Sequence, residues 1–223
     1  MDSTEKQSSK DMADHRSNIY GLLALVYRQE VTPDLLHQVK DPRFLRVFTD
    51  LGVEGVEAFL QNSEEKLIED LAVEYARLFL GPGKHISPHE SVHHQREDGD
   101  WGTLWGASTV DVKKFIEATG LGYEAGYKGM PDHISVEFEF MAALARREVQ
   151  AWFEGDEASA RSCVAVQKKF LEEHLIQWIP DFCEKVIRHA ELPFYRAVAE
   201  LTRGFIEFEI EELNRNGNKP NPV

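Results

Sequence analysis

The amino-acid sequence predicts an all-α protein, a single-domain bundle of about eight to ten helices with a long irregular loop at residues 81–106. Apolar residues recur at the spacing of one helical face in almost every segment outside this loop. No stretch bounded by turn residues alternates apolar with polar side chains, as a half-buried strand would. The 223 residues, of which 42% are hydrophobic, suffice for one sizeable core.

The first half of the chain is expected to form one long helix followed by shorter ones. Helices are predicted from Ala13 to Gln29 and around four later groups: Leu35, Leu36 and Val39; Phe44, Leu45 and Phe48; Val53 to Leu60; and Leu67, Leu71, Tyr75 and Leu78. Thr32 before Pro33 provides an N-cap and a first-turn proline. Ser63 is placed to cap the longer helix, which ends at Gly81.

The second half is expected to contain longer helices with clear boundary residues. One helix is expected to start at Ser108 or Thr109 and to end near Gly120, and the longest is expected to run from Asp132 to Gly155. Asp156 is expected to cap the next helix, and Pro193 to start the last one. Between these two, an apolar stripe from Leu175 to Val186 is expected to be bent or broken by Pro180. Aspartate, serine and threonine side chains accept hydrogen bonds from the free N–H groups of a first turn, whereas glycine adopts the left-handed backbone that ends a helix.

The two ends of the chain are polar. Residues 1–12 and 215–223 are expected to be disordered tails that flank one helical domain at residues 13–214. No apolar run follows a basic region near Met1, so neither a signal peptide nor a membrane span is expected there. Cys163 and Cys183 lie in apolar stretches and are expected to be reduced, partly buried thiols, which indicates a cytoplasmic protein.

The formal net charge of −14 restricts the class of partner. A negative surface repels a phosphate backbone, so nucleic acid is not an expected partner. A helix-turn-helix regulator is disfavoured for the same reason, and because no basic recognition helix is present. A basic or mixed-charge peptide fits the charge better.

The long loop contains a cluster of histidines that suggests metal chemistry. Glu90 and His93 have the Glu-x-x-His spacing that metal-carboxylate bundles place on their helices. A helical metal-dependent enzyme that uses His85, His89, Glu90 and His93 is therefore an alternative hypothesis. Such bundles need two of these pairs on facing helices, whereas one pair is present here, in a segment interrupted by Pro88. We therefore favour solvated loop histidines and expect no bound metal or other cofactor.

Pro131, Asp132 and His133 precede the longest predicted helix, and Glu137 follows one turn later. A carboxylate beside an imidazole can transfer protons, so this group is a candidate acid/base site. Asp132 also lies at a position where its carboxylate can cap the helix N-terminus. We favour capping over catalysis. No Gly-rich phosphate loop, nucleophile elbow or cysteine-pair metal motif accompanies the group, and we do not expect an enzyme.

Several aromatic residues lie where they can either fill the core or line a groove for a peptide. Tyr20 is expected to fill the core, because it lies on the first amphipathic helix. Trp101 and Trp105 are flanked by glycines in the long loop, so partial exposure is more plausible for both indoles.

The order of several motifs resembles a known family. Five sequence blocks occur in the order and spacing of the TorD, DmsD and NarJ group of molybdoenzyme maturation chaperones. These blocks are residues 74–79 (Glu-Tyr-Ala-Arg-Leu-Phe), the Ser87-Pro88-His89-Glu90-Ser91-Val92 segment, residues 106–109, residues 131–141 and the Phe194-Tyr195 pair. The match spans roughly residues 17 to 213. Residues 129–133 (Gly-Met-Pro-Asp-His) lack the glutamate found in many members of the export-signal branch, and look more like the nitrate-reductase branch.

This resemblance implies an all-helical chaperone that binds the N-terminal leader, often a twin-arginine signal peptide, of a molybdenum-cofactor oxidoreductase subunit. It implies a molybdopterin oxidoreductase catalytic subunit as partner, with transient contact to the export or cofactor-insertion machinery, and a monomer or a domain-swapped dimer. Together, the resemblance and the exposed indoles assign these residues to peptide binding: Tyr20, Ser87, Pro88, His89, Glu90, Ser91, Trp101, Trp105, Pro131, Asp132, His133 and Glu137.

Overall fold

The computed structural model describes residues 3–42, 54–81, 85–95, 101–123 and 128–217. Its α-helices are α1 (Ser3–Arg28), α2 (Pro33–Val39), α4 (Val56–Leu60), α5 (Glu64–Tyr75), α6 (Ala107–Ala118), α7 (Ile134–Glu154), α8 (Glu157–Phe170), α9 (Ile176–His189) and α10 (Pro193–Gly217). Two π-helical turns, Ala76–Leu80 and Leu171–Leu175, and a 3-10 turn, Glu90–Val92, complete the helical elements. The described ranges contain no β-strand, only two isolated bridges, so the predicted all-α fold is confirmed.

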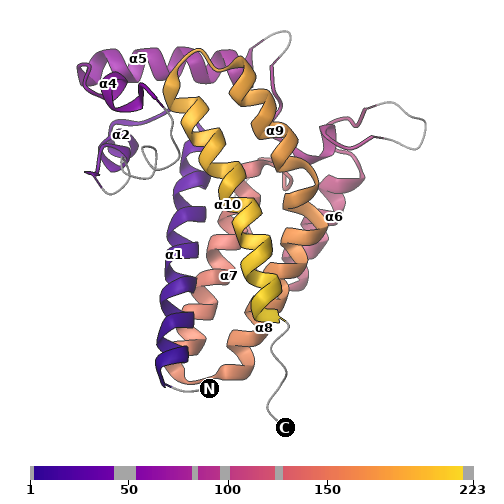
Figure 1. Ribbon diagram of the computed structural model, residues 1–223. Coiled ribbons are helices and arrows are strands. Elements are labelled where there is room, and N and C mark those ends of the chain that lie inside the picture. Colours follow the sequence, from indigo (N-terminus) through magenta and orange to yellow (C-terminus); the bar gives the residue numbers. More distant parts are fainter. Residues whose placement is uncertain (1–2, 43–53, 82–84, 96–100, 124–127, 218–223) are drawn as a thin grey trace.

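The long helices α1, α7 and α10 run along the length of the molecule, while α2, α4 and α5 gather at one end (Figure 1). Aromatic side chains join these elements in the core. Tyr27 of α1 lies against Phe79, Phe138 and Phe182 at ring-centroid distances of 6.1, 6.2 and 5.7 Å. Trp178 and Phe182 are fully buried, as their apolar stripe predicts. Burial of each such side chain contributes about 2–3 kcal/mol.

A buried polar cluster ties α1 to α7, α8 and α10. Arg16 donates hydrogen bonds to Glu209 and, at 3.1 Å, to Glu148. Gln167 also donates to Glu148, at 2.8 Å. These groups satisfy one another away from water, so each helix is fixed relative to the others by directional bonds as well as by apolar contact.

The Glu74 to Phe79 motif has a structural role in this fold. Arg77 holds the Glu74 carboxylate through two hydrogen bonds of 2.7 and 2.8 Å, and donates to the His189 carbonyl at 2.7 Å. Glu74 in turn accepts from the backbone N–H groups of Glu191 and Leu192. The motif therefore fixes the connection between α9 and α10, where free backbone donors would otherwise be unsatisfied.

Most predicted helix boundaries are confirmed. Thr32 accepts a hydrogen bond from Leu35 N, Asp156 accepts one from Ser159 N at 3.0 Å, and Pro193 begins α10. Gly155 ends α7 with a left-handed φ of 77°. The expected helix around Phe44 to Phe48 lies outside the described residues.

Other predicted boundaries were wrong. The first helix begins at Ser3 rather than Ala13, and its polar first turns include Lys6, which pairs with Glu157 at the start of α8. The last helix continues to Gly217. Gly106 occupies the N-cap of α6 instead of Ser108 or Thr109, and Ser63 is an N-cap whose side chain makes no capping hydrogen bond.

Pro180 does not break its helix. It lies inside α9, and α9 follows α8 directly through the π turn Leu171–Leu175. A π turn inserts one extra residue into the helical repeat and is often found at functional positions. In this case it places His174 in the interior.

None of the helices in the described ranges combines the length and the apolar character needed to cross a membrane.

Candidate functional site

The Ser87 to Ser91 loop lies directly against the segment that precedes α7. The backbone of His89 bridges to His133. Glu90 N donates to the Asp132 carbonyl at 3.0 Å, and Ile134 N donates to the Pro88 carbonyl at 2.9 Å. The structure therefore brings together the two irregular segments that the sequence marks as candidate sites.

Asp132 does not cap α7. His133 occupies the N-cap position, and its ring Nδ1 accepts a hydrogen bond from Ser135 N at 3.2 Å. The fully buried Asp132 carboxylate instead accepts a hydrogen bond from Ser91 N, at 3.0 Å through Oδ2. Its other oxygen, Oδ1, has no hydrogen-bond partner among the described residues. Asp132 thus fastens the loop to the start of α7, and its remaining lone pairs are unused.

Glu90 points into the protein and is held by two histidines. His174 Nδ1 donates to Glu90 Oε2 at 3.0 Å, and His94 Nε2 donates to Oε1 at 3.0 Å. Burial alone would raise the pKa of Glu90, but these hydrogen bonds outweigh burial and hold the pKa below its usual value. The hydrogen bond to Glu90 also raises the pKa of His94. Glu90 is therefore a buried, charged carboxylate.

Glu137 is a second buried carboxylate beside the first. Trp178 Nε1 donates to Glu137 Oε2 at 3.2 Å, while Oε1 receives no N–H or O–H donor from the described residues. Burial, followed by the negative charges of Glu90 and Asp132, raises the pKa of Glu137 well above its ordinary value. Three carboxyl groups thus crowd one desolvated region, which disfavours the ionised form of Glu137.

Burial favours the neutral form of three histidines at this site. Burial lowers the pKa of His93 to about 4 and that of His133 to about 3, and it also lowers the pKa of His89. His93 Nε2 donates to the Ser87 carbonyl at 2.8 Å, which fixes its tautomer. His85 is exposed. In the parts of the chain that the structure describes, no three His, Cys, Asp or Glu side chains form a group that could hold a metal ion.

Three exposed apolar side chains, Trp101, Leu104 and Trp105, lie within five residues of one another in the segment before α6 and are called the indole face. These side chains are 60%, 49% and 67% exposed. Lys185 Nζ lies 5.7 Å from the centroid of the Trp101 ring.

A Cβ added to Gly102 would lie only 1.8 Å from the Ser91 carbonyl oxygen, so only glycine allows the segment to pack this closely on the loop. Gly102 N also donates to the His94 carbonyl at 2.8 Å. The segment that carries the indole face thus packs on the loop that contacts the carboxylate cluster, which consists of Glu90, Asp132 and Glu137.

Trp105 adopts a left-handed backbone with a φ of 65°. This conformation is strained for a bulky side chain and costs of the order of 1–3 kcal/mol. The Trp105 side chain is two-thirds exposed, so its burial within the chain offsets little of this strain.

The other predicted site residues differ in accessibility. Pro88, Ser91 and Pro131 are buried, whereas Ser87, His89 and His133 are partly exposed. Tyr20 is fully buried in the core, with its ring 4.8 Å from that of Phe205, as its position on an amphipathic helix predicts. Sequence reasoning missed His174 and Trp178 as partners of the carboxylates, because no local pattern relates α9 or the π turn to the loop. It also gave no role to His94, which lies four residues after Glu90 in the loop itself.

Comparison with known proteins places the fold and the motifs in one family. The model of the nitrate reductase delta subunit family matches residues 49–184. The chaperone protein TorD of Shewanella pealeana is 25% identical over 216 residues, covering 91% of each chain, and that of Vibrio cholerae strain El Tor Inaba N16961 is 27% identical over 213 residues, covering 90% of this chain and 93% of that protein.

Among solved structures, a protein of Archaeoglobus fulgidus described as a redox enzyme maturation protein superposes with a TM-score of 0.50 at 22% identity, covering 86% of this chain and 93% of that one. This similarity shows a shared all-helical fold. The chain belongs to the nitrate reductase delta subunit family, the NarJ and TorD family of redox enzyme maturation chaperones.

Proposed function

We propose that this protein is a cytoplasmic chaperone that binds the N-terminal leader of a molybdenum-cofactor oxidoreductase subunit and holds that subunit for cofactor insertion before export. Family membership and the two TorD relatives support a role in maturation. In this role the protein catalyses no reaction, acts as a monomer or a helix-swapped dimer, and meets the insertion or export machinery transiently.

The indole face is the observation that carries this proposal. Exposure of Trp and Leu side chains to water is unfavourable, and the left-handed backbone of Trp105 is strained. Neither feature contributes to packing of the hydrophobic core. Aromatic side chains with these properties are enriched at the centre of protein interfaces, where they bury large areas against a partner. The apolar part of a leader is the segment that would cover this face.

The carboxylates suit the basic part of a leader, provided that the Ser87 to Ser91 loop moves. Asp132 Oδ1 and Glu137 Oε1 both lack donors among the described residues, and a guanidinium group could supply several. Both side chains are fully buried, so a direct contact requires the loop to open. The Ser91 to Asp132 hydrogen bond would then be replaced by bonds to the peptide.

Affinity capture from the native host tests this proposal. Tagged parent protein should capture a molybdoenzyme subunit, and a Trp101→Ser/Trp105→Ser double variant should capture about tenfold less of it. Phe153→Ser is the matched control, because Phe153 is an aromatic side chain of similar exposure, 72%, on α7. The proposal is contradicted if no molybdoenzyme subunit is captured, or if the double variant and the control capture equal amounts.

A further inference from the structure

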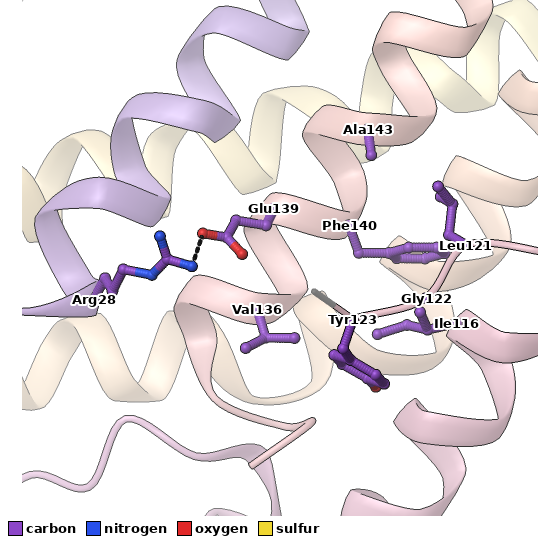
Figure 2. Close-up of a pocket in the computed structure, with 9 residues that line it drawn as sticks. All are labelled: Arg28, Ile116, Leu121, Gly122, Tyr123, Val136, Glu139, Phe140 and Ala143. Atoms are coloured by element: carbon purple, nitrogen blue, oxygen red, sulfur yellow. Dashed lines mark ion pairs between the residues drawn. The ribbon is translucent and has the colours of Figure 1, made fainter. Parts of the chain in front are cut away.

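A separate pocket lies between α1, α6 and α7, outside the residues that sequence analysis assigned to the site. Figure 2 shows Val136 and Phe140 of α7 facing Leu121 and Tyr123 across it. Ile116, Gly122 and Ala143 complete the apolar lining, and Arg28 and Glu139 stand at one side. Its residues come from three separate segments of the chain, so no single sequence motif marks it.

The size of the pocket suits one apolar side chain. Its cavity volume is about 120 Å³. A cavity of about 150 Å³ with a similar aliphatic and aromatic lining is known to hold a benzene ring, so a Leu or Phe side chain matches this space in volume and in chemistry. Water gains few hydrogen bonds against such walls, which favours its replacement by an apolar group.

The charged side of the pocket contains an exchangeable ion pair. Arg28 on α1 and Glu139 on α7 approach to 2.8 Å, and their side chains are 43% and 40% exposed. Ion pairs at this exposure contribute only about 0–1 kcal/mol, because water and salt screen them. A peptide arginine could therefore replace Arg28 on Glu139 at little cost.

We propose that this pocket is an anchor subsite of the leader: it takes one bulky apolar side chain, while a neighbouring peptide arginine displaces Arg28 from Glu139. This inference rests on the proposed function and extends it to a second surface. The chain's net charge of −14 favours a basic occupant over an acidic one. The subsite differs from the carboxylate cluster because its acid is partly exposed, so no loop needs to open.

Fluorescence anisotropy with a labelled peptide, two arginines followed by leucine and phenylalanine residues, tests the subsite. Ala143→Leu fills the pocket without removing a contact and should weaken binding about tenfold. Ala165→Leu, the same change at an exposed position on α8, should bind as the parent does. Circular dichroism and thermal unfolding of each variant establish that the fold is retained.

Substitution of Glu139 and substitution of Arg28 should change the peptide affinity in opposite directions. Glu139→Gln should weaken binding about threefold, whereas Arg28→Gln removes the competitor and should strengthen it by a similar factor. Reversed signs would contradict a peptide arginine on Glu139 and overturn the assignment. If the parent binds and Ala143→Leu binds equally well, the subsite is refuted while the proposed function stands. If the parent does not bind the peptide at all, the subsite is refuted, and the capture experiment decides the proposed function separately.

Discussion

Glu90, in the loop before α6, accepts a hydrogen bond of 3.0 Å from His174 on the π turn, although 84 positions separate the two residues. Both side chains are buried, so removing the imidazole leaves a desolvated carboxylate with His94 as its remaining histidine partner. We predict that His174→Ala lowers the free energy of unfolding by about 3 kcal/mol in urea titrations. His37→Ala, at an exposed histidine, should change it by less than about 0.5 kcal/mol, and equal losses would contradict this role for His174.

The neutral histidines of the loop predict a protein that loses stability in mild acid. The pKa of His93 is lowered to about 4 and that of His133 to about 3, from 6.5 in an unfolded chain. Their contribution to stability is therefore fully present above about pH 6.5 and is lost progressively as the pH falls toward these folded values. Each histidine accounts for up to about 1.4 kcal/mol per pH unit in this window.

Replacing one of these histidines should reduce the acid sensitivity. His133→Asn retains a side chain that can cap α7 but does not titrate, so its free energy of unfolding should fall less steeply between about pH 6.5 and about pH 5. His15→Asn, on the exposed side of α1, serves as the control and should keep the parent's slope. If the free energy of unfolding of His133→Asn falls with pH as steeply as that of the parent, the His133 imidazole does not cause the acid sensitivity.

The strained backbone at Trp105 predicts a variant that is more stable but binds less. Asparagine tolerates the left-handed conformation, so Trp105→Asn should raise the free energy of unfolding by about 0.5–1 kcal/mol. The same variant should capture less client, because it lacks an exposed indole. A loss of stability would mean that the indole packs on the protein itself more than its exposure indicates.

The raised pKa of Glu137 predicts that leader binding depends on pH. The raised pKa favours the protonated form in the free protein, whereas contact with a peptide guanidinium favours the carboxylate. Affinity for an arginine-containing leader should therefore increase as the pH rises, and Glu137→Gln should bind more weakly and lose this dependence. Helicity should stay unchanged in Glu137→Gln and in the companion variant Glu90→Gln. If both variants match the parent at every pH, these carboxylates do not contact the peptide.

Local signals in the sequence were sufficient for most of the fold. Gly155, Asp156 and Pro193 each act within one helical turn, so their positions alone identify helix boundaries. The start of α1 could not be found in this way. Its first turns are polar, and their contact with Glu157 depends on a helix that lies far along the chain.

The candidate site was only partly predictable for a similar reason. Sequence motifs identified the loop and the segment before α7, and both lie together in the structure. The role of Asp132 depends on its neighbour Ser91, which no helix-capping rule could supply. His174 faces inward because a π turn shifts the helical repeat, and regular periodicity does not anticipate such a shift.

The most direct test of the account is a titration of the captured subunit's own leader, as a labelled synthetic peptide, into the purified protein. We predict saturable binding that weakens with added salt yet persists, because charge steers the leader and apolar burial retains it. The Trp101→Ser/Trp105→Ser variant should bind about tenfold more weakly. Absence of saturable binding, or capture of the subunit that is equally strong after its leader is deleted, would contradict the claim that this protein is a leader-binding chaperone.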